Sequence, residues 1–168
     1  MASIMNRDRL MSTLSTKVLQ DPLYFLAFGF GSGLMPKAPG TWGTLAAIPI
    51  YLLLIGMPWW LYLTVLVAAF ICGVWICQKV SQDLGEHDYA GIVWDEIVGY
   101  LLVLFMAPSG WWWALLGFVL FRVFDIYKPQ PIKFVDKHVH GGLGIMLDDL
   151  LAAIPAWLIL QGLAYYLR

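Results

Sequence analysis

The sequence predicts an all-α fold, a polytopic membrane helix bundle of about five short spans with an N-terminal helix that lies in the interface or half enters the membrane. Three observations support this class. Of the 168 residues, 61% are hydrophobic and 12% are charged, about half the charged share of an average soluble domain. Nine Trp and eight Tyr are of the kind that gather where hydrocarbon meets water. The apolar residues also fall into long stretches without charge, and the length suits one domain over residues 1–168.

The first two spans are predicted between Lys37 and Lys79, because no charged side chain lies between them. One span needs about 20 residues, so this stretch has room for two. Pro58-Trp59-Trp60 is the natural turn of a hairpin between a helix near 43–57 and a helix near 61–78.

The middle of the chain is read as a second hairpin. Residues 97–121 carry no charge, but Pro108-Ser109-Gly110 interrupts them. We expect helices near 92–107 and 111–127. The alternative is a single kinked span over 97–121, which is disfavoured because Pro and Gly inside a helix would leave backbone groups unpaired in lipid.

The last span is predicted over the charge-free residues 150–167, with Asp148 and Asp149 at its start, where negative charge suits a helix N-terminus. Residues 22–34 are apolar, but they are too few to cross a membrane. They are therefore expected to form the surface or half-inserted helix.

Charge asymmetry predicts the topology. The two hairpins place nine of the ten Lys and Arg residues on one side, with only Arg168 opposite, as the positive-inside rule expects of the cytoplasm. We therefore expect a multi-pass membrane protein with an N-terminal cytoplasmic segment over residues 1–21 and cytoplasmic loops near 79–91 and 128–146. A net charge of −1 without a basic run makes nucleic acid an unsuitable partner.

Two acidic pairs lie inside apolar sequence, Asp95-Glu96 and Asp148-Asp149. In the hairpin topology both helices run inward from the cytoplasm, so the pairs lie at similar depth. Adjacent helical residues point about 100° apart, so each pair can offer one carboxylate to a shared centre and one to its flank. The carboxylates would repel each other unless a cation neutralised them, and Mg²⁺ is the first candidate.

A simpler explanation is that the acidic residues complement helix dipoles and reach the interface. Two pairs, with Asp125 at the same predicted level, favour function, because ionisable groups at membrane depth are costly.

Groups suited to an anion lie nearby: Arg122, Lys128, Lys133 and the turn over 138–142. The alternative for Arg122 is an ion pair with Asp125 on one helix face. The alternative for Lys133 and Lys137 is that they only add to the positive charge expected on the cytoplasmic side.

Two further segments are candidates for the site. In residues 29–44, glycines precede a helix start, where exposed N–H groups could bind phosphate with Thr41 or Thr44 as a cap; an ordinary Pro/Gly turn explains this segment equally well. The loop over 83–88 holds acids and a histidine, of which Asp83, His87 or Asp88 could support the acidic centre.

Four sequence blocks, GFGSGLMPKAPGTWGTLAAIP, HDYAGIVWDEIVG, FRVFDIYKPQPIKFVD and HVHGGLGIMLDDLLA, resemble those of the bacterial phosphatidylglycerophosphatase A family in the same order. The resemblance covers about residues 22–167. It implies a magnesium-dependent phosphatase that converts phosphatidylglycerophosphate to phosphatidylglycerol at the cytoplasmic face of the inner membrane, among membrane lipids.

Taken with this resemblance, the residues give a specific hypothesis for the site. Mg²⁺ is held by four carboxylates: Asp95, Glu96, Asp148 and Asp149. The phosphate is bound by a second set: Arg122, Lys128, Lys37 and Thr41. Asp125 or His140 moves the proton, and a covalent aspartyl-phosphate intermediate stays open.

Two other classes of protein are alternatives: a small cation transporter with a carboxylate-lined site and a noncatalytic membrane subunit. The transporter is disfavoured because the charges lie at one end of the helices and not near the midplane. The noncatalytic subunit has no evident need for such a cluster. Oligomeric state and acyl-chain preference have no signal in the sequence.

Overall fold

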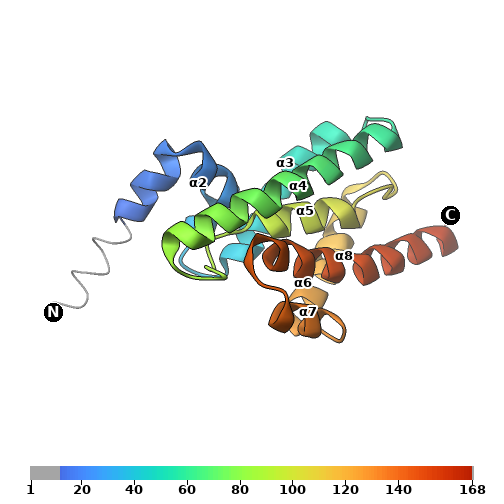
Figure 1. The fold of residues 1–168 in the computed structure, drawn as a ribbon. Helices are drawn as coiled ribbons and strands as arrows, with labels where there is room; N and C mark the ends of the chain where they lie inside the picture. The colour runs from blue at the N-terminus through green and yellow to red at the C-terminus, as the bar shows by residue number, and fades with distance from the viewer. Residues whose placement is uncertain (1–11, 168) are drawn as a thin grey trace.

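The structure is a computed structural model that describes residues 12–167, and it is helical throughout without a strand in that range (Figure 1). Residues 12–20 are helical, so the expected N-terminal segment lies partly outside the described residues. The elements that follow are α2 (Pro22–Ala27), the 3₁₀ helix η1 (Gly29–Leu34), α3 (Pro39–Leu54), α4 (Trp59–Leu84), α5 (Trp94–Val103), α6 (Trp111–Tyr127), α7 (Ile132–His138) and α8 (Gly141–Tyr166). The predicted all-α class is confirmed.

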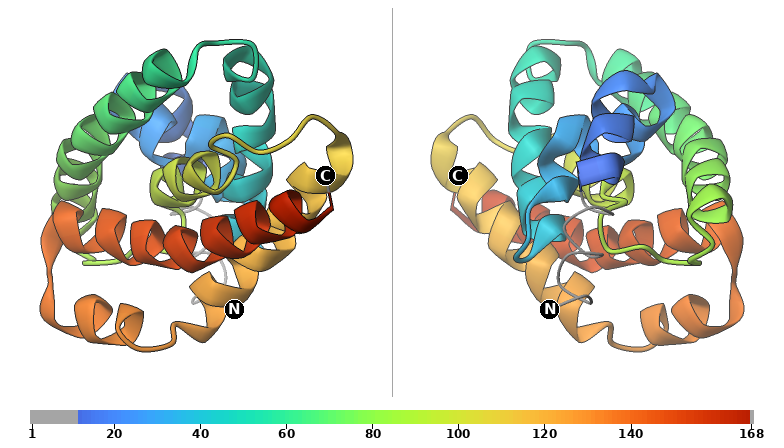
Figure 2. Two further views of the ribbon diagram at one scale, coloured as in Figure 1. Left: turned by 90° about the vertical axis from the view of Figure 1, so that its right-hand side faces the viewer. Right: turned by 90° about the vertical axis from the view of Figure 1, so that its left-hand side faces the viewer.

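The short helix α5 lies at the centre of the bundle. Figure 2 shows it enclosed by α3, α4, α6 and α8, and most of its residues are buried. Its start is fixed by two hydrogen bonds: the Val93 N–H donates to the carbonyl of Ala27 (2.9 Å), and Trp94 Nε1 donates to the carbonyl of Ala69 (3.1 Å). The first turn of α5 is therefore held in place by α2 and α4.

The first predicted hairpin is present, with Pro58 directly before α4. However, α4 is longer than expected and continues past Lys79 to Leu84. It ends at Gly85, whose φ of 71° is the left-handed conformation that commonly terminates a helix. The charged residues after the apolar stretch therefore continue the same helix and do not start a loop.

The second hairpin is also present, and the alternative of one kinked span over 97–121 is wrong. Residues 104–110 separate α5 from α6. The two helices pack antiparallel, because Gly99 near the start of α5 faces the ring of Phe121 near the end of α6, whereas Val103 at the end of α5 faces Gly117. Tyr100 Oη also donates to the carbonyl of Ala114 (2.7 Å).

Two expected boundaries need correction. Helix α8 begins at Gly141, so Asp148 and Asp149 lie about two turns inside it and do not meet its N-terminus. The dipole explanation therefore fails for this pair, whereas Asp95 and Glu96 do lie in the first turn of α5. Residues 22–34 form no single helix, since left-handed Phe30 and Gly31 break them.

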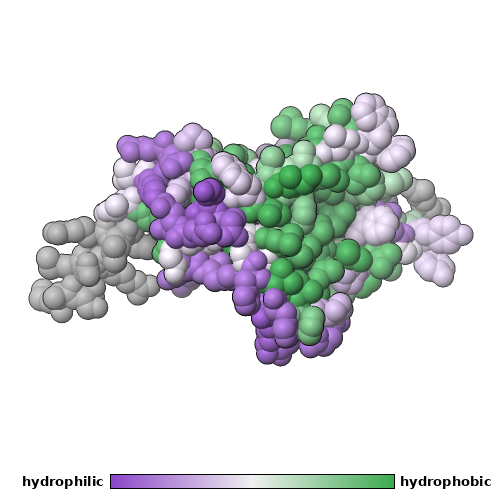
Figure 3. Space-filling view, in the orientation of Figure 1, coloured by the Kyte–Doolittle hydropathy of each residue, from purple (hydrophilic) through white to green (hydrophobic). Residues whose placement is uncertain are grey.

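The outer surface is strongly apolar. Figure 3 shows a broad hydrophobic band across the middle of one face, with polar residues gathered at the end where the N-terminal helices lie and on the lower edge. Two described helices, α4 and α8, are long and apolar enough to cross a membrane, and α3 is a shorter apolar helix. The count of five spans stays a prediction.

Exposed aromatic side chains mark the opposite end of the bundle. They lie at the starts of α4 and α6 and at the end of α8: Trp59, Trp60, Trp111, Trp112, Tyr165 and Tyr166. Because the helices alternate in direction, these positions share one end, as in an aromatic belt at a membrane surface. The acidic residues lie toward the other end.

Candidate active site

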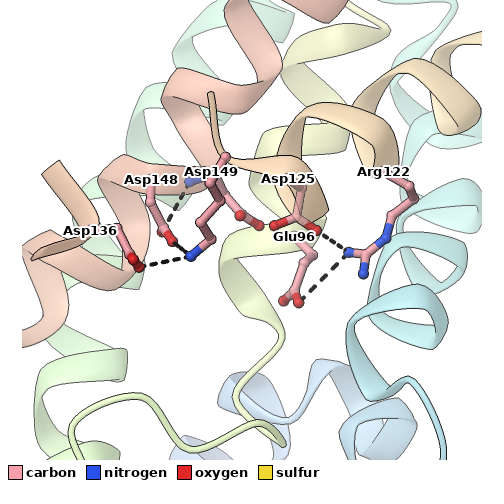
Figure 4. A network of polar contacts seen from close by, with 7 residues as sticks. Glu96, Arg122, Asp125, Asp136, Asp148 and Asp149 are labelled. Atoms are coloured by element: carbon pink, nitrogen blue, oxygen red, sulfur yellow. Dashed lines mark hydrogen bonds and ion pairs between the residues drawn. The ribbon is translucent and has the colours of Figure 1, made fainter. Parts of the chain in front are cut away.

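Three helices bring charged side chains together near one end of the bundle. The first turn of α5 supplies Asp95 and Glu96, and the last two turns of α6 supply Arg122 and Asp125. Helix α8 supplies Asp148 and Asp149. Figure 4 shows Glu96, Arg122, Asp125, Asp148 and Asp149 of this group, and in it the side chains of Asp125 and Asp149 point toward one another.

Asp95, Glu96 and Asp149 form what we call the carboxylate cluster. Each offers one carboxylate oxygen, and these three atoms all lie within 4.8 Å of one another. Asp95 and Asp149 are buried, with 7% and 3% of their surface exposed. One oxygen on each residue, Asp95 Oδ1, Glu96 Oε2 and Asp149 Oδ2, is buried without any hydrogen-bond partner in the structure.

Such oxygens are costly to bury, because an unsatisfied polar group loses its hydration without a replacement. Mutual repulsion between three carboxylates adds to the cost. A hard divalent cation relieves both costs, since Mg²⁺ and Ca²⁺ bind through oxygen ligands. The carboxylate cluster therefore fits a metal ion by its chemistry and by its unpaired oxygens.

The fourth predicted ligand, Asp148, has a different partner. Lys128 Nζ lies 2.5 Å from Asp148 Oδ2 and 2.8 Å from Asp136 Oδ1. Burial opposes charge on this lysine, but the two hydrogen bonds outweigh it and raise the pKa of Lys128 above its ordinary value. Lys128, predicted to bind phosphate, is thus held between two carboxylates, and its role toward substrate stays a prediction.

Arg122 makes the ion pair that was the alternative explanation for it. Its Nη1 lies 2.5 Å from Asp125 Oδ2 and 3.9 Å from Glu96 Oε1, and 15% of the Arg122 side chain is exposed. The Arg122 Nε atom is buried without a hydrogen-bond partner. The Nη1 atom likewise lacks a hydrogen bond despite its ion pair with Asp125, so two donor atoms of the guanidinium beside the carboxylate cluster are unsatisfied.

The two proton-transfer candidates differ in position. Asp125 touches the site through Arg122. His140 lies at the start of α8, about 13 Å along the helix from Asp149 at 1.5 Å per residue, and its ring packs against His87. The structure brings Asp125, and not His140, to the carboxylate cluster.

The predicted caps of α3 are wrong. The helix begins after Ala38, whose φ is 49°, and no side chain caps it. Thr44 Oγ1 instead donates to the carbonyl of Gly40 inside the helix (2.9 Å), and Thr41 lies in the first turn. Lys37 is exposed just before this turn, so the phosphate roles of Lys37 and Thr41 stay predictions.

Sequence reasoning missed the role of Gly40. A Cβ atom on Gly40 would overlap Glu96 Oε1 and lie 3.2 Å from Arg122 Nη1. The first turn of α3 therefore forms one wall of the site, and only glycine lets it approach so closely. The signal was present as Pro39-Gly40, a favoured helix start followed by a residue without a side chain.

The predicted supporting segment over 83–88 is divided between two regions, since Asp83 lies in the last turn of α4 and His87 and Asp88 lie in the loop after it. Asp83 accepts hydrogen bonds from Lys17 and Tyr24, and the bond from Lys17 raises the pKa of that lysine. His87 and Asp88 instead line a pocket of about 220 Å³ together with Asp148. Two of the three expected supporting residues thus border the site.

The fold and the site define an α-helical protein with two helices long and apolar enough to cross a membrane, which gathers carboxylates and an arginine at one end of its bundle. Residues 25–164 match the sequence profile of the family described as Phosphatidylglycerophosphatase A, and the chain belongs to this family. The resemblance predicted from the four sequence blocks is confirmed.

Named relatives agree with this family. Phosphatidylglycerophosphatase A of Escherichia coli K12 is 44% identical over 150 residues, which cover 89% of this chain and 85% of the relative. The protein of the same name from Haemophilus influenzae is 47% identical over 153 residues, or 89% and 93% of the two chains. A Bacteroides thetaiotaomicron protein with the provisional name phosphatidylinositol-3-phosphatase is 36% identical over 143 residues, or 79% and 87%. No solved structure matches the chain.

Proposed function

We propose that this chain hydrolyses phosphatidylglycerophosphate to phosphatidylglycerol and inorganic phosphate with the help of Mg²⁺. Membership of the family and the two relatives that carry the enzyme's name support the reaction. The observation that carries the chemistry is the carboxylate cluster, in which three buried oxygens lack partners.

Asp95, Glu96 and Asp149 are the residues that would hold the ion. When bound, Mg²⁺ supplies polarisation of the phosphoryl oxygens and neutralises negative charge. Asp148 is the nearest further carboxylate along the chain, and it is engaged by Lys128.

The other residues act on the phosphate and on the proton. Arg122 donates to phosphate oxygens, since its Nε–H is spare and a guanidinium suits phosphate geometry. Asp125 orients that guanidinium through their 2.5 Å contact. As water attacks phosphorus and the bond to the glycerol oxygen breaks, Asp125 takes the proton of the water and returns one to the departing oxygen.

Burial makes these interactions stronger. The side chains of Arg122, Asp125 and Glu96 are 12–15% exposed, so charges among them are poorly screened by water. Hydrogen-bond donors that are already fixed in a buried site stabilise the negative charge that develops during phosphoryl transfer, because they do not have to reorganise first.

The position of the site suits a lipid substrate. The carboxylate cluster lies in the first turn of α5 and in the first half of α8, toward the end of the bundle opposite the exposed Trp and Tyr side chains. A lipid can thus keep its acyl chains in the membrane while its phosphate reaches the cluster. The basic side chains predict that this end faces the cytoplasm of the inner membrane.

The test is phosphate release by the purified chain from phosphatidylglycerophosphate, with Mg²⁺ titrated after removal by a chelator. Asp95→Asn and Asp149→Asn should each lower catalytic efficiency by about 100-fold or more and raise the Mg²⁺ concentration needed for activity. Mutation of residues that only support metal ligands already lowers metal affinity or activity by about 10- to 100-fold. Asp83→Asn is the matched control, because Asp83 is an exposed carboxylate bound to Lys17.

The headgroup is tested in the same assay with phosphatidylinositol 3-phosphate as the competing substrate, given the name of the Bacteroides relative. Faster release from the inositol lipid would replace the proposed substrate. Absence of phosphate release, with cation flux in proteoliposomes, would instead favour the transporter.

A further inference from the structure

The first turn of α8 is capped by side chains from another part of the chain. The Gly142 N–H donates to Gln78 Oε1 (2.6 Å), and the Gly141 N–H donates to His87 Nε2 (2.6 Å). His140, at the N-cap position, makes no side-chain capping bond of its own. The N–H groups at the start of a helix need such partners, and here α4 and the loop after it supply two of them.

Glycine permits this contact between α4 and α8. A Cβ atom on Gly142 would overlap the backbone carbonyl of Val74, and one on Gly141 would overlap Gln78 Oε1. Gly141 also has a φ of 76°, which favours glycine. The backbone of α8 therefore begins directly against α4, at a position that larger residues would change.

This geometry also corrects the role considered for the turn over 138–142. This turn was a candidate to bind an anion, but the N–H groups of Gly141 and Gly142 already donate to His87 and Gln78. The two glycines serve helix docking.

We propose that Gln78 is a positioning residue for the metal site. Its hydrogen bond to Gly142 fixes where α8 lies along its own axis, so that Asp149 meets Asp95 and Glu96. Gly142 precedes Asp149 by seven residues, about 10 Å along a stiff helix. Apolar helix faces in lipid have no hydrophobic force to hold them in register, so interhelical hydrogen bonds and close packing at small residues do so. This inference rests on the proposed function of the carboxylate cluster.

The far end of α8 has its own anchor, which gives a structural control. Trp157 Nε1 and Gln161 Nε2 both donate to the carbonyl of Phe105, at 2.8 and 3.0 Å. Gln161 lies twelve residues beyond Asp149, about 18 Å away along the helix. Loss of the Gln161 bond therefore removes a comparable interhelical bond while Trp157 still holds that end.

The experiment measures Mn²⁺ binding to the full chain in detergent by electron paramagnetic resonance, together with thermal unfolding and the kinetics of phosphate release. Gln78→Met removes the oxygen that accepts the hydrogen bond from Gly142 but keeps a side chain of similar size, whereas Gln78→Glu keeps an acceptor oxygen. Gln161→Met is the control for a lost bond at the far anchor, and Gln82→Met is the control for an exposed glutamine one turn further along α4.

We expect Gln78→Met to weaken Mn²⁺ binding by about 10-fold and to raise the Mg²⁺ requirement equally, as for other residues that support metal ligands. The KM for lipid at saturating Mg²⁺ should not change. Gln78→Glu should retain cation affinity close to that of the wild type. Gln161→Met should lower the unfolding temperature without changing Mn²⁺ affinity.

Wild-type Mn²⁺ affinity in Gln78→Met, or equal losses of affinity in Gln78→Met and Gln161→Met, would overturn the positioning role. If Gln78→Met does not fold, Gln78→Asn, which is too short to keep the bond, gives the same comparison. A wild-type chain that binds no Mn²⁺ would overturn the metal centre itself, and this outcome is separate from a failure confined to Gln78.

Discussion

Lys128 Nζ lies 2.5 Å from Asp148 Oδ2, so two adjacent aspartates have different electrostatic partners. Asp148 is neutralised by an ammonium group from the end of α6. Asp149 turns toward Asp95 and Glu96 and keeps one buried oxygen unpaired. Because Lys128 pairs with Asp148, the carboxylate cluster contains three residues, and a positively charged side chain lies beside it.

Replacement of Lys128 tests this division. Lys128→Met leaves Asp148 and Asp136 without their partner, so we expect the free energy of unfolding to fall by about 1–3 kcal/mol. The freed Asp148 becomes available to a cation, so divalent-cation affinity should rise. Denaturant unfolding and Mn²⁺ binding measure the two effects. A raised KM for lipid with unchanged Mn²⁺ affinity would instead assign Lys128 to the substrate phosphate.

Arg122 is tested by comparing its two roles. If it serves only as the partner of Asp125, Arg122→Gln should cost about 3–5 kcal/mol of stability, because it leaves a buried charge unpaired. If it binds phosphate, catalytic efficiency should fall by about 10²- to 10³-fold while the fold survives. We expect the second result, with partial recovery in Arg122→Lys, which keeps the charge without the planar fork.

The double variant Arg122→Gln/Asp125→Asn separates these roles, because it removes both charges of the pair. Melting temperature and phosphate release are measured together. A double variant that regains both stability and activity would contradict a substrate role for Arg122.

Gly40→Ala probes the wall formed by α3. Alanine favours a helix over glycine by about 1 kcal/mol, but its methyl group would overlap Glu96 Oε1. We expect catalytic efficiency to fall by about 10²-fold, the cost of misplacing a catalytic group by about 1 Å. The matched control is Gly162→Ala, since a Cβ atom at Gly162 meets nothing within 4 Å. Equal activities for the two variants would show that the first turn of α3 does not border the reaction.

The topology is tested by labelling single cysteines at Gln82 and Lys137 in a background without Cys72 and Cys77. Both positions are exposed at the polar end of the bundle, and the positive-inside rule places that end in the cytoplasm. A membrane-impermeant thiol reagent should therefore label them only after the cells are opened. Labelling in intact spheroplasts would place these two positions on the outer side.

The sequence by itself determined the helical class, the two hairpins and the family. These depend on local signals: apolar stretches between charges, Pro and Gly at the turns near 58 and 108, and four ordered sequence blocks. It also predicted that Asp95, Glu96, Asp125 and Arg122 meet, because a hairpin necessarily returns the end of its second helix to the start of its first. The 3.9 Å contact of Arg122 on α6 with Glu96 on α5 confirms that these two helix ends meet.

Only the tertiary structure decided how the charges are divided and what holds them in place. Asp148 and Asp149 point about 100° apart on α8, so the rotation of that helix against its neighbours determines which of them joins the carboxylate cluster. The approach of Gly40 to Glu96 and the bond from Gly142 to Gln78 likewise join residues more than 50 positions apart. Such contacts depend on how whole helices are placed in three dimensions, and the order of residues along one helix carries no signal for them.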